Sequence, residues 1–207
     1  SDSNKKTSFK NSYYCNLIER NPTTGTVYEG SGKIASPLLN VSSQNISGLD
    51  LNISKIFDVD FGEIRLNNFL SYLLKNDIQL RPSLPIEDCK GKYENTCGLP
   101  SPQIQNIFSI DFIYKVSQFD ASSNLTMRYI DGVDDSNTQK PIDFSSYYYL
   151  DMNFSIDLVN DINFSFGINN IFDKNPPLNG KSINYVPGNA NTYPSYYDPL
   201  GRFVYLN

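Results

Sequence analysis

Apolar and polar side chains alternate at every second position along several segments of this chain, and almost no segment has the 3.6-residue period of a helix. Residues 147–158 give the clearest example. One face of this segment carries Tyr148, Leu150, Met152, Phe154, Ile156 and Leu158, and the other carries Tyr147, Tyr149, Asp151, Asn153, Ser155 and Asp157. This alternation predicts a β-strand with one apolar and one polar face.

The same pattern recurs in further segments, so we expect about seven strands. Residues 162–169 repeat it directly after a turn predicted at Asn160-Asp161. Alternation also runs through residues 107–116, 125–129, 48–57 and 63–74, and a last segment begins at Gly201. The sequence therefore predicts an all-β fold with antiparallel strands.

Short turns alternate strictly with long loops along the chain. The turns predicted at 58–61, 117–120 and 160–161 span about 2 to 4 residues, whereas the loops at 81–102, 134–143 and 174–199 span roughly 10 to 26. All long loops then lie at one end of an up-and-down sheet, as in an outer-membrane β-barrel. Tyrosines near that end, at 147–149, 193, 196 and 197, are expected to form an aromatic girdle.

A β-sandwich in water uses the same alternation, with a second layer of protein over the apolar face. The polar faces here are mostly Asn, Ser, Asp, Gly and Tyr rather than Lys and Glu, which favours a barrel over the sandwich. The alternative is a soluble secreted β-sandwich that binds sugar or protein through its long loops.

The composition excludes several classes of function. The chain has no histidine, so Ser-His-Asp and Cys-His catalysis and His-ligated zinc are excluded. The net charge of −5 and a pI of about 4.7 argue against nucleic-acid binding. No stretch approaches the ~20 apolar residues of a membrane-spanning helix. We expect no enzymatic activity, metal or cofactor; a hydrolase that uses two loop carboxylates is the third hypothesis.

Three cysteines suggest an oxidising compartment. Cys89 and Cys97 bracket a short segment that contains glycine and asparagine, and their proximity favours a disulfide between them over the other two pairings. Cys15 is then left over, and we expect its partner upstream of Ser1. The alternative is three reduced, buried thiols.

The C-terminal third contains recognisable motifs. Gly167-Ile168-Asn169-Asn170-Ile171-Phe172-Asp173-Lys174-Asn175-Pro176-Pro177 is followed by Asn191-Thr192-Tyr193 and by Tyr197-Asp198-Pro199-Leu200-Gly201-Arg202-Phe203. In order and spacing, these resemble the C-terminal end of TonB-dependent outer-membrane receptors. Cys15-Asn16-Leu17-Ile18-Glu19-Arg20, Ser47-Gly48-Leu49-Asp50-Leu51, the Cys89–Cys97 loop and Arg128-Tyr129-Ile130-Asp131 resemble the same family.

The resemblance implies a transmembrane β-barrel of 22 strands with an N-terminal plug in its lumen. Residues 1–207 would form the C-terminal part of that barrel, about seven strands, without the plug, and we expect the chain to be a fragment. The resemblance also implies the outer membrane of a Gram-negative bacterium and active uptake of a scarce solute, such as a siderophore, cobalamin or saccharide. Its partners would be outer-membrane lipid, that solute and, through the plug, the TonB energy-coupling system. The ligand and its contact residues stay open, and the final strand lacks the terminal aromatic residue usual in the family.

Few residues suggest a specific site. Arg65, Arg128, Asp151 and Asn153 on the polar face either line a substrate path or, more simply, fill the lumen and contact the plug. Gly180-Lys181-Ser182 ends like a phosphate-binding loop, but Asn175 replaces its first glycine. Asp131, Asp134, Asp135 and Asn137 offer oxygens to calcium without the EF-hand order, and a solvated acidic loop is the simpler interpretation.

Overall fold

The computed structural model describes residues 13–28, 30, 32–36, 40, 42–93, 96–116, 119–136, 141–158, 162–179 and 191–207. The chain divides into two units, Ser1–Val41 and Ser42–Asn207. In the smaller unit, a 3₁₀ turn η1 (Tyr13–Leu17) leads into β1 (Ile18–Glu19), which pairs antiparallel with β2 (Lys33–Ile34).

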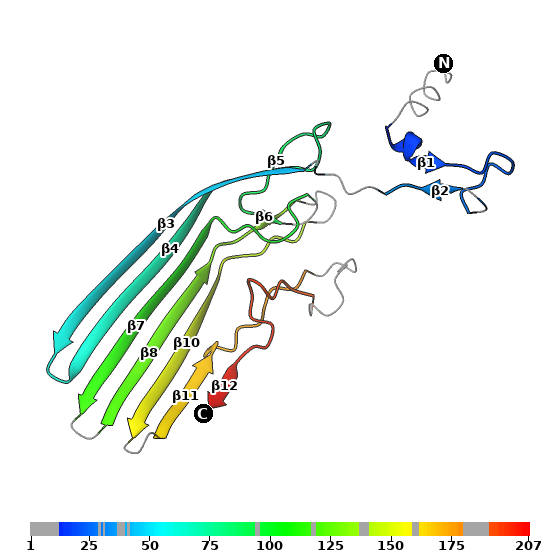
Figure 1. Cartoon of the computed structure of the whole chain (residues 1–207). Coiled ribbons are helices and arrows are strands. Elements are labelled where there is room, and N and C mark those ends of the chain that lie inside the picture. Colours follow the sequence, from blue (N-terminus) through cyan, green and yellow to red (C-terminus); the bar gives the residue numbers. More distant parts are fainter. Residues whose placement is uncertain are drawn as a thin grey trace. The chain divides into compact units, whose positions relative to one another are not determined.

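The larger unit is built on one sheet, whose long strands lie side by side (Figure 1). Their order across the sheet is β12-β11-β10-β8-β7-β4-β3, and β5 pairs with β4 at the loop end. All these pairs are antiparallel. The bounds are β3 (Ser43–Val59), β4 (Gly62–Gln79), β5 (Glu87–Asp88), β7 (Ile104–Val116), β8 (Phe119–Ile130), β10 (Tyr147–Leu158), β11 (Ile162–Asn169) and β12 (Phe203–Leu206).

The prediction of an all-β, antiparallel fold is confirmed. Strands β10 and β11 have the bounds that the alternation indicates, and two residues separate β3 from β4. At that turn, Gly62 has a φ of 145°, and a Cβ atom there would lie 1.9 Å from the carbonyl oxygen of Ile113. Glycine is therefore required for β4 to begin against β7. Within the described residues the sheet is open, with β3 and β12 as its two edges.

One face of the sheet is apolar and is not covered by a second layer among the described residues. Cross-strand pairing places its side chains in continuous rows, for example Phe57, Ile64, Phe112, Ser123, Phe154, Phe166 and Leu206. No large apolar side chain of this face is buried within the described part of the chain; Leu125 is 36% exposed, Phe164 41% and Leu51 49%. Soluble monomers rarely expose so continuous an apolar surface.

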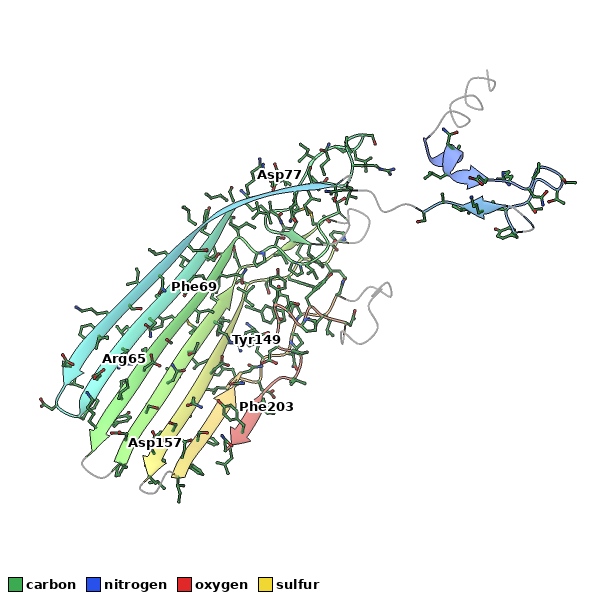
Figure 2. The ribbon with its side chains drawn as sticks, viewed as in Figure 1. Arg65, Phe69, Asp77, Tyr149, Asp157 and Phe203 are labelled. Atoms are coloured by element: carbon green, nitrogen blue, oxygen red, sulfur yellow. A yellow bond between two sulfur atoms is a disulfide. The ribbon has the colours of Figure 1, made fainter. Side chains whose placement is uncertain are left out.

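The opposite face is polar, and the long loops fold against the end of this face that lies away from the short turns. The loop strand β6 (Lys92–Tyr93) pairs in parallel with β9 (Asp134–Asp135). The buried apolar cluster lies here, where Ile130 and Tyr149 of the sheet meet loop residues Tyr93, Val133, Phe144 and Tyr197. Figure 2 shows Tyr149 at this end of its strand and Asp157 at the other.

This arrangement corrects the expected tyrosine girdle. Tyr149 and Tyr197 are buried in the cluster, and Tyr147, Tyr193 and Tyr196 pack against it. Tyr148 alone of this set lies on the apolar face, where it is exposed. Alternation assigns Tyr147 and Tyr149 to the polar face, but it does not indicate that loops cover them. No helix in the described part of the chain is long and apolar enough to cross a membrane.

Candidate functional site

The polar face carries a series of hydrogen-bonded side chains along its length. Near the short turns, Glu63 accepts from Arg65 (Nη2 to Oε2, 2.8 Å) and from Lys115 (Nζ to Oε1, 2.6 Å). Further along, the carboxylate of Asp111 accepts from Asn67 of β4 at 3.0 Å and from Asn124 of β8 at 2.6 Å. Each carboxylate therefore joins neighbouring strands, and near the turn the negative charge of Glu63 is balanced by the positive charges of Arg65 and Lys115.

Arg128 and Asp151 form the most enclosed ion pair on this face among the described residues. Arg128 donates from Nε to Oδ2 at 2.7 Å and from Nη2 to Oδ1 at 3.2 Å, across β8 and β10. The guanidinium also lies 4.9 Å from the ring centroid of Tyr149. Asp151 Oδ1 accepts a further bond from the backbone N–H of Asn170 at 2.8 Å. The bidentate geometry leaves no uncompensated charge at this position.

The four polar-face residues that the sequence singled out therefore do not converge on one point. Arg128 and Asp151 pair with each other, whereas Arg65 bonds to Glu63 on its own strand. Asn153 donates to the hydroxyl of Tyr205 at 2.9 Å, which links β10 to the edge strand β12 across β11. The Tyr205 ring lies directly over Gly167, where a Cβ atom would be 2.2 Å from it. These contacts organise the face rather than assemble catalytic groups.

The C-terminal motifs anchor the loop between β11 and β12. Asn170, at a φ of 54°, exchanges two hydrogen bonds with the backbone of Lys174, each at 2.9 Å. Asp173 Oδ1 accepts from the backbone N–H of Arg202 at 2.8 Å, so the beginning and the end of this long loop are joined. The backbone N–H of Asp198 donates to the hydroxyl of Tyr149 at 3.2 Å. The loop is thereby fixed against the polar face.

The disulfide between Cys89 and Cys97 is confirmed, with an S–S distance of 2.10 Å. Cys89 is fully buried, and its backbone N–H donates to the carbonyl of Asn76 on β4. Within the bridged segment, Tyr93 stacks on Phe144 at 4.6 Å and donates its hydroxyl to the carbonyl of Ile142. The bridge therefore holds Tyr93 in the aromatic cluster. Cys15 is exposed in the smaller unit, and its pairing stays a prediction.

Two hollows open between the sheet and the loops. The first has a volume of about 460 Å³ and is lined by β3, β4, the segment 97–103 and Tyr196. The second, of about 350 Å³, is lined by β4, β7, β8 and the turn at Ser195 and Tyr196. Both volumes fall within the range of small-molecule sites. Three residues line both hollows: Ser71, Gln105 and Tyr196. The sequence did not indicate any of them as site residues. For Ser71 and Gln105, the only sequence signal is that the alternation of their strands places them on the polar face.

Burial in this loop region raises the pKa values of two tyrosines. The pKa values of Tyr196 and Tyr197 are raised above the ordinary value because burial disfavours the charged phenolate. The hydroxyl of Tyr197 is buried and has no hydrogen-bond partner among the described residues. Both phenols are therefore neutral at physiological pH.

The remaining sequence candidates act locally or fall outside the described residues. Asp131 accepts from Tyr129 and from the backbone of Gly132, and Asp135 accepts from the backbone of Ile142, so these acids stabilise their own loop. No group of three or more His, Cys, Asp or Glu residues that could hold a metal ion occurs among the residues described here. Gly180-Lys181-Ser182 and Asn137 lie outside the described residues.

Comparison with known proteins gives no independent assignment. No protein-family model, curated protein or solved structure matches the chain significantly.

Proposed function

We propose that the sheet is part of the wall of a transmembrane β-barrel, the C-terminal part of a TonB-dependent outer-membrane receptor. In this proposal, lipid covers the apolar face, the polar face lines an enclosed interior, and the long loops lie at the outer rim. The whole receptor captures a scarce solute and imports it with energy supplied through TonB.

One observation carries this proposal: the apolar face is continuous and exposed while the loops pack on the polar face. Leu51, Leu125 and Phe164 come from three different strands, and none is buried among the described residues. A water-soluble β-sandwich would bury this face against a second sheet and leave the polar face free. The observed burial is the reverse, because the large apolar side chains of the sheet that are buried among the described residues are Tyr149 and Ile130, both on the polar face.

The open edges are consistent with a wall that continues on both sides. β3 is a 17-residue edge strand, and hydrocarbon cannot satisfy the hydrogen-bonding groups on its outer side. A barrel wall requires further strands at β3 and β12 to close it. The family assignment rests on the motifs at 167–177 and 191–203, whose residues Asp173 and Arg202 meet at the base of one loop.

Fractionation of cells that produce the protein tests the membrane part of this proposal. We expect the protein in the outer-membrane pellet after an alkaline carbonate wash, with release only by detergent. Solubility at high concentration without detergent would refute it. The TonB part has a separate test: in cells lacking TonB, uptake of the solute should fall to the passive level. Unchanged active uptake in those cells would contradict the receptor assignment while leaving the barrel intact.

A further inference from the structure

The two hollows between the sheet and the loops share one wall. Ser71 of β4, Gln105 of β7 and Tyr196 of the C-terminal loop line both of them. Ser71 and Gln105 are directly opposite each other in the pairing of β4 with β7, so their side chains lie on the same face of the sheet. The hollows are therefore adjacent and share one continuous wall.

The polar side chains of this shared wall make no hydrogen bonds within the described part of the chain. No described residue makes a hydrogen bond with the side chains of Ser71, Gln105 or Tyr196, whereas the neighbouring Gln103 donates to the hydroxyl of Tyr72 at 2.8 Å. A serine hydroxyl, a carboxamide and a phenol all both donate and accept. The wall thus presents neutral, bifunctional hydrogen-bonding groups beside an aromatic ring.

Charge is nearly absent from this surface among the residues that the structure describes. None of the described residues that line the first hollow is charged, and of those that line the second only Arg128 is. Asp151 compensates that guanidinium in a bidentate pair. Burial of an anionic or cationic ligand here would leave its charge without a partner, which is costly. The surface therefore suits a ligand with many hydroxyl groups and no net charge.

We propose that this shared surface binds a neutral oligosaccharide. A pyranose ring has a C–H face that packs on an aromatic ring such as Tyr196, and its hydroxyls exchange hydrogen bonds with an amide and a hydroxyl. This inference rests on the proposed function and deepens it by naming the class of solute. Binding itself requires neither transport nor TonB, so it is tested separately from them.

Calorimetric titration of the whole chain, folded in lauryldimethylamine oxide micelles, tests the inference. The probes are oligosaccharides of α-1,4-glucan, β-1,4-glucan, β-1,4-xylan and fructan, with ferric citrate as an anionic chelate and a capped Gly-Ser hexapeptide as a neutral peptide. We expect at least one oligosaccharide to bind and the chelate and peptide not to bind. Gln105→Leu and Tyr196→Phe should each weaken that binding roughly three- to tenfold, by loss of one neutral hydrogen bond.

Ser155→Ala is the matched control, because Ser155 lies on the same face in a separate hollow near the short turns. It should leave oligosaccharide affinity unchanged. Circular dichroism of each variant confirms that the sheet is folded. Binding of the chelate or the peptide in place of every oligosaccharide would overturn the proposal. The same holds for a folded chain that binds none of the probes, or for binding that Gln105→Leu and Tyr196→Phe leave unaltered.

Discussion

Replacement of Leu125 by arginine distinguishes a lipid-facing sheet from a water-facing one. Leu125 lies in β8 on the apolar face, between Ile110 of β7 and Met152 of β10, and is 36% exposed. Thr126, the next residue, lies on the polar face between Ser109 and Asp151. The two positions are neighbours on one strand, so Leu125→Arg and Thr126→Arg place the same charge at nearly the same depth on opposite faces of the sheet.

The expected magnitudes differ enough to decide between the two environments. Arginine on the lipid face near the bilayer midplane lowers the free energy of unfolding by about 2–4 kcal/mol. This corresponds to a roughly 30- to 900-fold change in the folding equilibrium. In water, substitution of a partly exposed residue changes stability by only about 0.5 kcal/mol. Thr126→Arg should cost less than about 1 kcal/mol in either environment, because the polar face does not contact hydrocarbon and position 126 is next to the charged pair Arg128–Asp151.

Urea unfolding in phosphatidylcholine vesicles, followed by circular dichroism, measures both variants. We expect Leu125→Arg to lower the unfolding midpoint strongly and Thr126→Arg to leave it close to wild type. Leu125→Gln provides a graded variant if the arginine variant does not insert. Equal effects of Leu125→Arg and Thr126→Arg, or a cost for Leu125→Arg below about 0.5 kcal/mol, would refute a lipid-covered apolar face.

Three further predictions concern the loop region. Reduction of Cys89–Cys97, or the double serine variant, should destabilise the loops by about 2.5 kcal/mol, measured by thermal unfolding with and without reductant; no change would refute a role in holding Tyr93. Tyr197→Phe should be neutral or stabilising by up to about 1 kcal/mol, because the buried hydroxyl of Tyr197 has no hydrogen-bond partner among the described residues. Tyr149→Phe should destabilise by about 0.5–1.5 kcal/mol, because the hydroxyl of Tyr149 accepts from the backbone N–H of Asp198. The reverse order of stability in urea titrations would contradict the structure. Because the pKa values of Tyr196 and Tyr197 are raised in the folded state, the stability that these two phenols contribute is complete below pH ~10 and is lost as the pH rises through their folded-state pKa values. Alkaline titration should therefore unfold the loops, and Tyr197→Phe should reduce this loss of stability. An unchanged pH profile in that variant would show that Tyr197 does not titrate with unfolding.

The strands were the most predictable part of the fold. Period-2 alternation is a local property, so it placed β10 at Tyr147–Leu158 and β11 at Ile162–Asn169 without any tertiary information. It missed the start of β3 and the end of β4, which pair with each other and shift register between Ser47 and Gly48. A bulge interrupts the alternation there, so the pattern fails while the strand continues.

The candidate site was less predictable, because its contacts depend on register across long loops. The sequence places Arg128 and Asp151 on polar faces, but it does not reveal that β8 and β10 pair with Thr126 opposite Asp151. Tyr196 belongs to a loop with no periodicity, so only its folded position shows that it lines the same hollows as Ser71 and Gln105. The Cys89–Cys97 bridge was predictable because the two cysteines are only eight positions apart in the sequence.

Single tryptophans on β10 test the central claim most directly, since the chain contains none of its own. Phe154→Trp and Ser155→Trp place the probe on opposite faces of one strand at neighbouring depths. In vesicles whose acyl chains carry bromine, we predict strong quenching of tryptophan at position 154 and little at position 155. Equal quenching at both positions, or none at position 154, would contradict a sheet whose apolar face contacts lipid.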